Sequence, residues 1–559
     1  MVDPKYNPSG LISYAEIRQK LKLVLGSENQ FYIVTFVYGL GVGVLTLAIP
    51  ISVQSLVNTV SSNVLIQPLV VLSLLLLSLL IFSGILKAFQ TYIIESFQRR
   101  FYARTSSEIS VKILNASYSQ TNERNAVELM NRYFDVMTVQ KTVAKLLTDG
   151  VSLILKTVVG LLLLAFYHPY FLVFDVLLVI LIALVWKIYG KAAIKSAIYE
   201  SKAKYQVASW LEELARANFF FKTDSKKKRA LKKSDDLIHN YLNKRESHFK
   251  KLFSQKIFLL IIYAFMSALV LGLGGYLVIN GELSLGQLVA AELIVTVILS
   301  SLSNSAKYLE SFYDLYAAVD KISSFHGLTP ETSVLLSNKE PLIGGDLNFD
   351  SVRVNNGKSN LFYDFNFKAG STYIIESKVY SSKQFFLSLI QQIEHPHEGE
   401  IKLGNQVFGS LSPIILRDEV HVITKTLTFE GSIRENLSWG KDNIKDSELT
   451  LALQNTYLGE SLNSFEDGLD TLLLPSGYPF WSSQLFRFEI ARALINKPKI
   501  LVLTEVFDQI EDKRILSMMK ELQKLDITII YVTNKNLNNM LYEEKLILDE
   551  RGLSRYEDE

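Results

Sequence analysis

Long apolar stretches dominate the first half of the chain and predict helices that cross a membrane. The sequence is apolar on every side of a helix from Phe31 to Val60 and again from Leu65 to about Ile85. Each stretch is long enough for the roughly 20 residues that a bilayer core requires. Four further candidates follow in two pairs: Val151 to Tyr167 with Tyr170 to Trp186, and Ile257 to Ile279 with Leu285 to about Leu302. We therefore predict six spans, and an even number places both termini on one side.

The distribution of Lys and Arg indicates which side that is. The short turns between paired spans, Ser61 to Val64, His168-Pro169 and Asn280 to Ser284, contain neither residue. The long connections contain many, as in Arg99-Arg100 and Lys226 to Arg229. Because cytoplasmic segments carry the excess of positive residues, we predict that the long connections and both termini are cytoplasmic.

The long connections themselves, about Gln98 to Lys145 and Tyr189 to Gln255, keep a helical periodicity with few breakers. We expect the spanning helices to continue through them into the cytosol, and the Lys226 to Lys233 run to be a solvated helix face. At the N-terminus Leu11, Ile17, Leu21 and Leu25 recur among basic residues. This pattern predicts a short amphipathic helix on the membrane surface within residues 1–30.

Three ionisable residues fall inside the predicted spans: Lys156 near mid-depth, and Asp175 and Glu292 nearer the outer surface. A lone charge in lipid costs a few kcal/mol or more, so such residues need water or a partner. One hypothesis is that all three line an internal cavity. The alternative is an ion pair between Lys156 and Asp175 that serves helix packing only.

The pattern changes after about residue 325, where the apolar runs become short and alternate with amphipathic helices. Strands are predicted at Asp346 to Val354 and Ser371 to Glu376, with a helix from Ser381 to Gln392. Further on, a helix beginning near Trp481 is followed by the aliphatic run Ile500 to Leu503, which is typical of a buried parallel strand. The C-terminal part is therefore predicted to be an α/β domain.

Composition supports this division and excludes several classes of protein. With 49% hydrophobic residues over 559 positions, the chain is too apolar for an ordinary soluble enzyme. The net charge of +2 gives no reason to expect a nucleic-acid partner. The absence of cysteine excludes disulfides, thiolate metal sites and a cysteine nucleophile, and we expect no metal site built from protein ligands alone.

The C-terminal motifs resemble those of ABC transporters of the exporter type. Ser482-Ser483-Gln484, the helix through Leu494 and the strand ending before Glu505 are similar to the signature helix and Walker B strand of that family. Phe429 to Leu437 resembles the segment after the Q-loop, and Gly281 to Val289 resembles the exporter turn before the sixth span. Trp210 to Arg216 is similar to exporters of the bacterial type I secretion class.

The resemblance implies a half-transporter with an all-α transmembrane domain of six helices and a P-loop-NTPase-like α/β nucleotide-binding domain. The implied boundaries are a surface helix at 1–30, the transmembrane domain at 31–325, a linker at 326–341 and the nucleotide-binding domain at 342–559. Coupling helices are expected near Asn122 to Asn131 and Glu212 to Phe221. Two such chains would form one transporter, in the cytoplasmic (inner) membrane with the nucleotide-binding domains in the cytoplasm.

The same resemblance assigns a nucleotide site whose chemistry is largely missing. A phosphate loop uses glycines, a Lys on the phosphates and a Ser or Thr on Mg²⁺. Here Ser377 and Ser382 stand at the glycine positions, Gln384 replaces the hydroxyl residue, and Asn356 replaces the aromatic residue that stacks on adenine. Only Lys383 is retained, and we expect it to be solvated.

The downstream positions are altered in the same way. Thr424 stands at the Q-loop glutamine, Trp481 and Ser482 at the signature Ser and first Gly, Thr504 at the Walker B aspartate and Asn534 at the switch histidine. Glu505 matches the general base. Since phosphoryl transfer depends on positioning and electrostatics, these changes together predict absent or strongly impaired hydrolysis, with ATP and Mg²⁺ as cofactors only if the site still binds them.

Three functions remain open at this point. In the first, the chain is a pseudo-ATPase subunit that pairs with an ATP-competent partner and supplies half of the translocation pathway; whether the dimer is a homodimer or a heterodimer with a second half-transporter is left open. Alternatively it is an active homodimeric exporter that uses Lys383 and Glu505, or a membrane scaffold or regulator that transports nothing. If the secretion-type resemblance extends to function, a periplasmic adaptor and an outer-membrane channel would be further partners.

Overall fold

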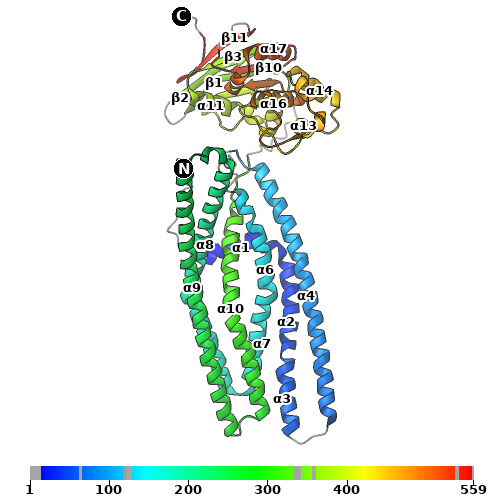
Figure 1. The fold of residues 1–559 in the computed structure, drawn as a ribbon, viewed down its shortest axis with the longest axis vertical. Coiled ribbons are helices and arrows are strands. Elements are labelled where there is room, and N and C mark those ends of the chain that lie inside the picture. Colours follow the sequence, from blue (N-terminus) through cyan, green and yellow to red (C-terminus); the bar gives the residue numbers. More distant parts are fainter. Residues whose placement is uncertain are drawn as a thin grey trace. The chain divides into compact units, whose positions relative to one another are not determined.

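The computed structural model describes residues 14–61, 66–118, 120, 129–331, 342–355, 360–535 and 540–556. The chain divides into two compact units, Met1–Glu331 and Thr332–Glu559 (Figure 1). The first is built from helices and the second from a sheet with helices. Each unit is described by itself below.

The first unit is a bundle of long helices. In chain order they are α1 (Tyr14–Leu25), α2 (Asn29–Thr46), α3 (Ala48–Ser61), α4 (Ile66–Asn115), α6 (Asp135–Lys145), α7 (Val151–Tyr167), α8 (Pro169–Arg216), α9 (Asp224–Ile279) and α10 (Leu285–His326). Within the described residues, six helical segments are long and apolar enough to cross a membrane. The predicted all-α domain of six spans is confirmed.

The predicted helix ends at the two short turns agree with the structure. His168 separates α7 from α8, because its own backbone is extended. Its Nδ1 accepts a hydrogen bond from Tyr170 N–H. Between α9 and α10, Ser284 caps the second helix, because its hydroxyl accepts from Gln287 N–H and the Gln287 side chain accepts from Ser284 N–H. Pro169 at the first helical position and a Ser cap are standard start signals, which is why the sequence located these ends.

Polar contacts join the two turns to each other and to α3. His168 Nε2 lies 3.0 Å from a Glu282 carboxylate oxygen, and Tyr167 donates a hydrogen bond of 2.7 Å to Gln54 Oε1. Gly286 faces α3 so closely that a Cβ there would meet the Gln54 carbonyl oxygen at 2.9 Å and the Asn58 side chain. The ends of α3, α7, α9 and α10 are therefore held together at this end of the bundle.

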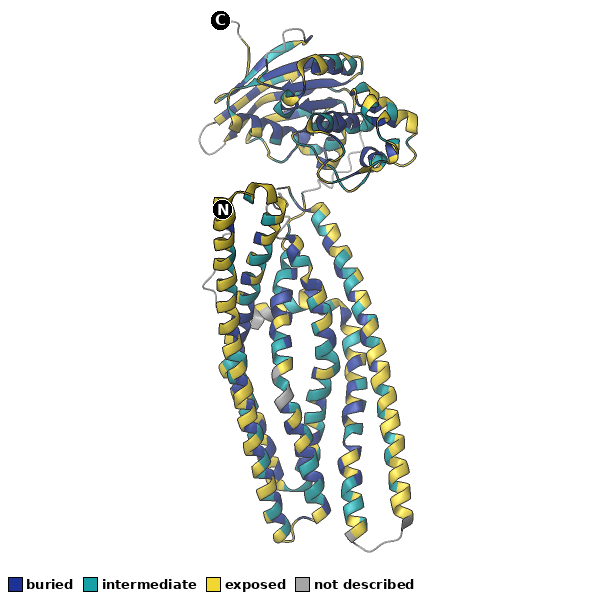
Figure 2. Ribbon diagram, viewed as in Figure 1, coloured by how far each residue is buried: buried dark blue, intermediate teal, exposed yellow. Residues whose placement is uncertain are grey.

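The long helices extend well beyond a bilayer. At 1.5 Å per residue, the 50 residues of α4 span about 75 Å, against about 30 Å of hydrocarbon. The apolar side chains of its first half are largely exposed, as the yellow ribbon of α4 shows in Figure 2. A lipid-facing helix has this property. The first predicted span is not one continuous helix, because α2 and α3 are separated at Leu47.

The N-terminal helix packs more deeply than a purely interfacial helix would. Leu21 and Leu25 of α1 contact a core that includes Phe97 and Phe101 of α4 and Ile322 of α10. Leu11 lies outside the described residues. The domain boundaries given above remain predictions.

The second unit is an α/β fold around a sheet of ten strands in the order β5-β4-β1-β2-β12-β11-β3-β10-β9-β6. The strands are β1 (Leu347–Asn355), β2 (Asn360–Phe367), β3 (Thr372–Ser377), β4 (Glu398–Leu403), β5 (Gln406–Val407), β6 (Val420–Ile423), β9 (Ile500–Leu503), β10 (Thr528–Val532), β11 (Glu544–Asp549) and β12 (Gly552–Arg555). The pair β7 (Gly431–Ser432) and β8 (Leu472–Leu473) forms a separate small sheet. The predicted α/β class is confirmed.

Strand direction divides this sheet into two parts. The β3, β6, β9, β10 and β11 strands run parallel, whereas β1, β2, β4 and β5 pair antiparallel. All four residues of β9 and all five of β10 are buried, which explains their continuous aliphatic sequences. Helices α11 (Tyr380–Ile390), α12 (Pro413–Glu419) and α17 (Asp512–Leu522) pack on the sheet through two apolar cores.

A smaller helical cluster has its own apolar core. It contains α13 (Ile433–Ser438), α14 (Asp446–Asn455), α15 (Gly459–Asn463) and one face of α16 (Ser482–Asn496). The other face of α16, through Phe486 and Ile490, belongs to the core beneath the sheet. Helix α16 therefore connects the helical cluster to the parallel strands.

Candidate functional site

The carboxyl ends of four neighbouring parallel strands place most of the predicted site residues at one edge of the sheet. Strands β3, β10, β9 and β6 are adjacent; β3 ends at Ser377, and the segments after the other three begin at Thr533, Thr504 and Thr424. In open α/β sheets this edge is where ligands bind. The structure therefore brings the regions of Ser377, Lys383, Thr424, Thr504 and Asn534 together.

Lys383 and Glu505 form an ion pair at the centre of this edge. Lys383 lies in the first turn of α11, and its side chain passes over the Tyr380 ring with Nζ 4.7 Å from the ring centre. Only 6% of Lys383 is exposed. The expectation that Lys383 is solvated is therefore wrong, because Glu505 provides a counter-charge from a strand end 122 residues away in sequence.

The segment between β3 and α11 is short and does not form an open phosphate cradle. Only Lys378 and Val379 separate the strand from the helix, and Lys383 N–H already bonds to Val379 C=O at 3.3 Å. Among the described residues with positive φ, none falls between Ser377 and Lys383. A phosphate-binding nest needs successive backbone N–H groups in alternating αR and αL conformations, and this backbone has no αL residue with which to form one.

Ser382 is fully buried rather than directed at a ligand. Its hydroxyl is buried without a hydrogen-bond partner among the described residues, and its carbonyl accepts from Tyr363 OH at 3.2 Å. Burial raises the pKa of Tyr363, so this hydroxyl stays protonated. Gln384, one residue after Lys383, is exposed.

Thr504 takes a structural role at the position where the resemblance implies a metal-binding carboxylate. Its side chain is 2% exposed and donates a hydrogen bond of 3.0 Å to the Ile423 carbonyl on β6. Thr424, which follows the last residue of β6, is exposed. Within the parts of the chain that are described, no group of three or more His, Asp or Glu side chains could hold a metal ion.

Trp481 and the residues after it form the start of α16. Trp481 is 78% exposed, and its backbone N–H donates a hydrogen bond of 2.7 Å to Gln484 Oε1. Gln484 in turn donates to Ser461 Oγ at 2.8 Å, so its amide is used in capping and packing. Ser482 is exposed and Ser483 half-buried, and no recorded hydrogen bond joins either described residue to Lys383 or Glu505.

Two acidic residues that the sequence reading missed organise the surroundings of the site. Asp508 accepts hydrogen bonds of 2.6 Å from Tyr531 OH and Thr533 Oγ1, which ties the segment after β9 to the end of β10. Glu489, on α16, is buried, accepts from Leu427 N–H at 2.5 Å and pairs with Arg492. Burial raises the pKa of Glu489, and Arg492 opposes that shift.

The remaining site predictions concern Asn534, Asn356 and the two coupling-helix regions. Asn534 is exposed just after Thr533. Asn356, the residue at the predicted adenine position, lies outside the described residues, as do residues 122–128 of the first predicted coupling helix. In the second such region, α8 ends at Arg216 and a short 3₁₀ turn, Asn218–Phe221, carries the exposed Phe219.

The ionisable residues of the spans do not pair with one another. Asp175 on α8 is 6% exposed, and neither of its carboxylate oxygens has a hydrogen-bond partner among the described residues. Glu292 on α10 has one buried oxygen without a partner, and Lys156 on α7 is half-buried. The alternative of a Lys156 to Asp175 ion pair is therefore not found.

Comparisons with known proteins agree with the fold of the two units. Residues 32–302 match the family described as ABC transporter transmembrane region. The ATP-dependent permease MDL1 of Candida albicans is 24% identical over 480 residues, which cover 82% of this chain and 69% of that protein. The alpha-hemolysin translocation ATP-binding protein HlyB of Escherichia coli is 25% identical over 289 residues, 50% of this chain and 41% of that protein.

A solved structure matches over almost the full length. It is titled the structure of a bacterial Atm1-family ABC exporter with ATP bound, and the TM-score is 0.81 at 16% identity, over 97% of this chain and 95% of that one. At this identity the match shows the fold. A further relative, the uncharacterized ABC transporter ATP-binding protein YwjA of Bacillus subtilis, is 24% identical over 46% of its length. The alignments to HlyB and YwjA thus span less than half of each relative.

Proposed function

We propose that this chain, which contains an ABC transporter transmembrane region and has the fold of an ABC exporter half-subunit, is a transporter subunit whose nucleotide-binding domain does not hydrolyse ATP. Two such subunits, or this one and a second half-transporter, would enclose one translocation pathway. The proposal places the chain in the cytoplasmic membrane with residues 342–559 and both termini in the cytoplasm. The Lys and Arg content of the long connections supports that orientation.

The Lys383 to Glu505 ion pair is the observation that carries the proposal. Lys383 is the single retained cation of the phosphate loop, and Glu505 is the single retained catalytic carboxylate. Each neutralises the other in the absence of ligand. A triphosphate would have to displace Glu505 from Lys383 before either group could act on it, and displacement of a partly buried charge pair is costly.

The rest of the site supports the same conclusion. Binding of Mg·ATP needs backbone N–H donors, a metal ligand and a sensor for the γ-phosphate. The short connection before α11, the buried Thr504 hydroxyl and the exposed Trp481 occupy the corresponding places. If ATP and Mg²⁺ bind at all, Lys383 would contact phosphate and the ion would draw its ligands mainly from phosphate and water.

The test is nucleotide turnover by the purified full chain in lipid nanodiscs. We expect no Mg·ATP hydrolysis above background, and no change on Glu505→Gln. The exposed neighbour Lys378 provides a matched control, because Lys378→Ala removes a cation from the same segment without touching Glu505. Turnover that is abolished by Glu505→Gln and retained by Lys378→Ala would refute the proposal and establish the second candidate, an active homodimeric exporter.

One observation favours that second candidate. The other carboxylate oxygen of Glu505, Oε2, is buried without a partner among the described residues. A general base needs an oxygen that is free to accept a proton from water. Export by the chain alone in proteoliposomes, driven by ATP, would separate the active exporter from both the pseudo-ATPase and a scaffold that transports nothing.

The proposal extends to the translocation pathway and to partner proteins. Lys156, Asp175 and Glu292 are candidates for lining the translocation pathway, since ionisable groups inside a membrane bundle are usually functional, and buried carboxylate oxygens of Asp175 and Glu292 have no partner among the described residues. HlyB is named for alpha-hemolysin translocation, which supports a periplasmic adaptor and an outer-membrane channel as candidate partners here. Co-purification of the full chain with an ABC subunit that carries intact motifs would identify a heterodimer.

A further inference from the structure

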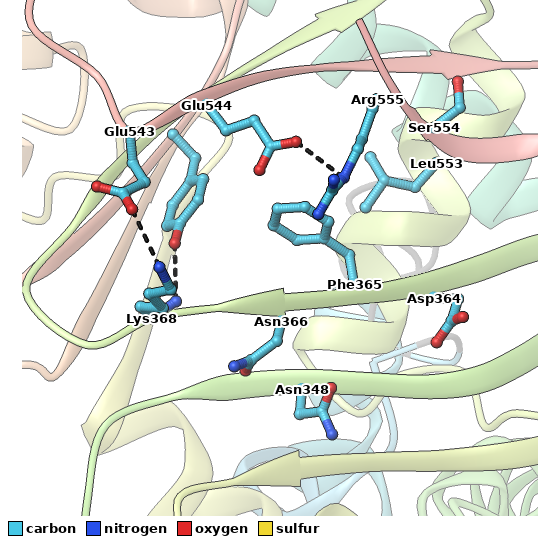
Figure 3. A pocket seen from close by; sticks show the side chains of 11 residues that line it. Asn348, Asp364, Phe365, Asn366, Lys368, Glu543, Glu544, Leu553, Ser554 and Arg555 are labelled. Carbon is cyan, nitrogen blue, oxygen red and sulfur yellow. Dashed lines mark hydrogen bonds and ion pairs between the residues drawn. The ribbon is translucent and has the colours of Figure 1, made fainter.

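The sheet of the second unit is nearly split between β2 and β12. These two parallel strands share one residue pair, Gly552↔Phe362, whereas β1 and β2 pair from Leu347↔Phe367 to Asn355↔Asn360. Gly552 makes the single pair because it has a φ of +123° and because a Cβ there would collide with the Phe362 backbone. Beyond this pair the strands separate, and a pocket of about 500 Å³ lies between them (Figure 3).

The β2 side of this pocket is an unpaired strand edge. Phe362 N–H donates to Arg551 C=O at 2.7 Å, so the backbone groups of Phe362 point toward β12. In an antiparallel ladder such as β1 with β2, alternate residues point their N–H and C=O groups to the same side. Asp364 and Asn366 therefore direct theirs into the pocket that they line, and within the described residues the ladder between β2 and β12 has no pair beyond Phe362.

Charge inside the pocket is not balanced. Lys368 pairs with Glu543 at 3.2 Å and Arg555 pairs with Glu544 at 3.0 Å, as the dashed lines in Figure 3 show. The Asp364 carboxylate has only a long hydrogen bond of 3.4 Å from Ser351 N–H, and no ion pair is recorded for it among the described residues. The lining therefore carries an unbalanced negative charge, which favours a cationic occupant and disfavours an anionic one.

The remaining wall of the pocket is aromatic. Phe365 and Tyr373 meet edge to face with ring centres 5.7 Å apart, and Tyr373 OH accepts a hydrogen bond from Lys368 N–H. Side chains alternate along β2, so Phe365 projects from the opposite face to Asp364, and its ring can contact an apolar side chain that neighbours the basic residue on an added strand. A volume of about 500 Å³ is within the range of about 300 to 1,000 Å³ typical of ligand pockets.

We propose that this pocket binds an extended peptide segment with a basic side chain, which pairs with the β2 edge as an added strand. Its backbone would bond to Asp364 and Asn366, and its Lys or Arg would face the Asp364 carboxylate, since directly opposed side chains on paired strands lie about 5 Å apart. Addition of a strand to a free edge is a general mode of peptide recognition. The segment belongs to a partner protein, and the site uses none of the residues assigned to the nucleotide site, so the proposal stands apart from the question of ATP hydrolysis.

The first experiment selects ligands without assuming their sequence. A random heptapeptide library displayed on phage is panned against the full chain in nanodiscs and, in parallel, against Asp364→Asn. We expect wild type to enrich peptides in which Lys or Arg stands directly next to an apolar residue. Asp364→Asn keeps an acceptor for Ser351 N–H and should lose that enrichment, whereas Asp442→Asn, a matched change at an exposed loop carboxylate, should retain it. Absence of enrichment on wild type, or equal enrichment on Asp364→Asn, overturns the proposal.

The second experiment separates strand pairing from simple cation binding. Affinity of the selected peptide is compared with that of the same peptide N-methylated on the residues that face β2, and with competition by spermidine. We expect N-methylation to weaken binding at least tenfold and spermidine to compete only weakly. Equal affinity of the N-methylated peptide, or full displacement by micromolar spermidine, would assign the pocket to free organic cations and refute the peptide. Unchanged thermal unfolding of each variant confirms that its fold is intact.

Discussion

Lys383 on α11 and Glu505 after β9 neutralise each other across the strand ends of the second unit, although they are 122 residues apart in sequence. Lys383 is almost fully buried, whereas the side chain of Glu505 is 38% exposed. The ion pair is therefore neither fully exposed nor fully buried, and water reduces its net contribution to the free energy of folding. The pair links the first helix after β3 to the end of β9 and so holds two edges of the site together without a nucleotide.

This arrangement predicts coupled effects on stability. Lys383→Met leaves a partly buried carboxylate without its partner, and Glu505→Gln leaves a buried ammonium, so each change should lower the thermal unfolding midpoint. In the double variant neither charge is left alone, and we expect it to recover about 1 to 2 kcal/mol relative to the sum of the single changes. The midpoints are measured by differential scanning fluorimetry of the full chain. If the midpoint shift of the double variant equals the sum of the two single shifts, Lys383 and Glu505 are not energetically coupled.

Arg487 provides a second stability test, inside the helical cluster. It is 2% exposed and donates to the carbonyls of Tyr457 at 2.6 Å and Ser483 at 3.2 Å. Burial lowers the pKa of Arg487 to about 10, so the guanidinium stays charged at neutral pH. We expect Arg487→Met to cost about 1 to 3 kcal/mol, because it leaves buried carbonyls unsatisfied.

The control for that change is Arg514→Met, which removes an exposed guanidinium paired with Glu511. A surface substitution of this kind should change stability by less than about 0.5 kcal/mol. Both variants are compared by the urea midpoint of the full chain in nanodiscs, followed by limited proteolysis of the α14–α16 region. Equal effects of the two substitutions would show that the Arg487 contacts contribute nothing.

His421 on β6 predicts a dependence of stability on pH. Burial lowers the pKa of His421 below its usual 6.5, and the positive charge of Arg492 lowers it further. Below pH 6.5 the unfolded chain therefore binds a proton that the folded chain does not, so stability falls as the pH drops from 6.5 toward the folded pKa. Above pH 6.5 His421 does not make the stability of the fold depend on pH.

The measurement is the thermal midpoint between pH 7.5 and 5.0 for wild type, His421→Asn and the exposed control His395→Asn. We expect the wild type and the His395 variant to lose stability more steeply on acidification than His421→Asn does. If all three proteins share one slope, His421 is not the titrating group.

In the membrane unit, the approach of α10 to α3 can be tested at a glycine. A Cβ at Gly286 would meet the Gln54 carbonyl oxygen at 2.9 Å and the Asn58 side chain, whereas at Gly272 nothing lies within 4 Å. Gly286→Ala should therefore destabilise by about 1 to 3 kcal/mol through overpacking. Gly272→Ala, also within a helix, should be neutral or slightly stabilising because Ala is the better helix former. Thermal unfolding of the two variants in detergent checks the difference, and a loss at Gly272 equal to that at Gly286 would contradict it.

Much of the architecture could be predicted because its determinants are local. Span length, the His168-Pro169 break and the Ser284 cap are each contained within a few residues, so the helix ends between α7 and α8 and between α9 and α10 were located correctly. The buried strands β9 and β10 were recognisable from continuous aliphatic runs. The interruption at Leu47 between α2 and α3 was missed, although Pro50 marks it, because a proline cannot donate a hydrogen bond to the carbonyl four residues earlier, that of Thr46.

The site was harder to predict because its contacts join distant segments. The positions of Lys383 and Glu505 could be assigned by resemblance, but their mutual pairing depends on the parallel order of β3, β10 and β9, which a linear sequence does not display. Asp508 and Glu489 were missed for the same reason, since their partners lie on another strand or loop. Asp508 lies five residues after the end of β9, in the turn Glu505–Gln509, and no local pattern there indicates its contacts with β10.

The contacts at the α7–α8 and α9–α10 turns also determine how readily this end of the bundle can separate. The pairs His168 with Glu282 and Tyr167 with Gln54 are single polar contacts, each contributing on the order of 1 kcal/mol net. Thermal motion can break and remake bonds of that strength many times without unfolding any helix. This end of the bundle would therefore behave as a reversible seal, whose opening is limited by the packing of Gly286 against α3 rather than by its polar contacts.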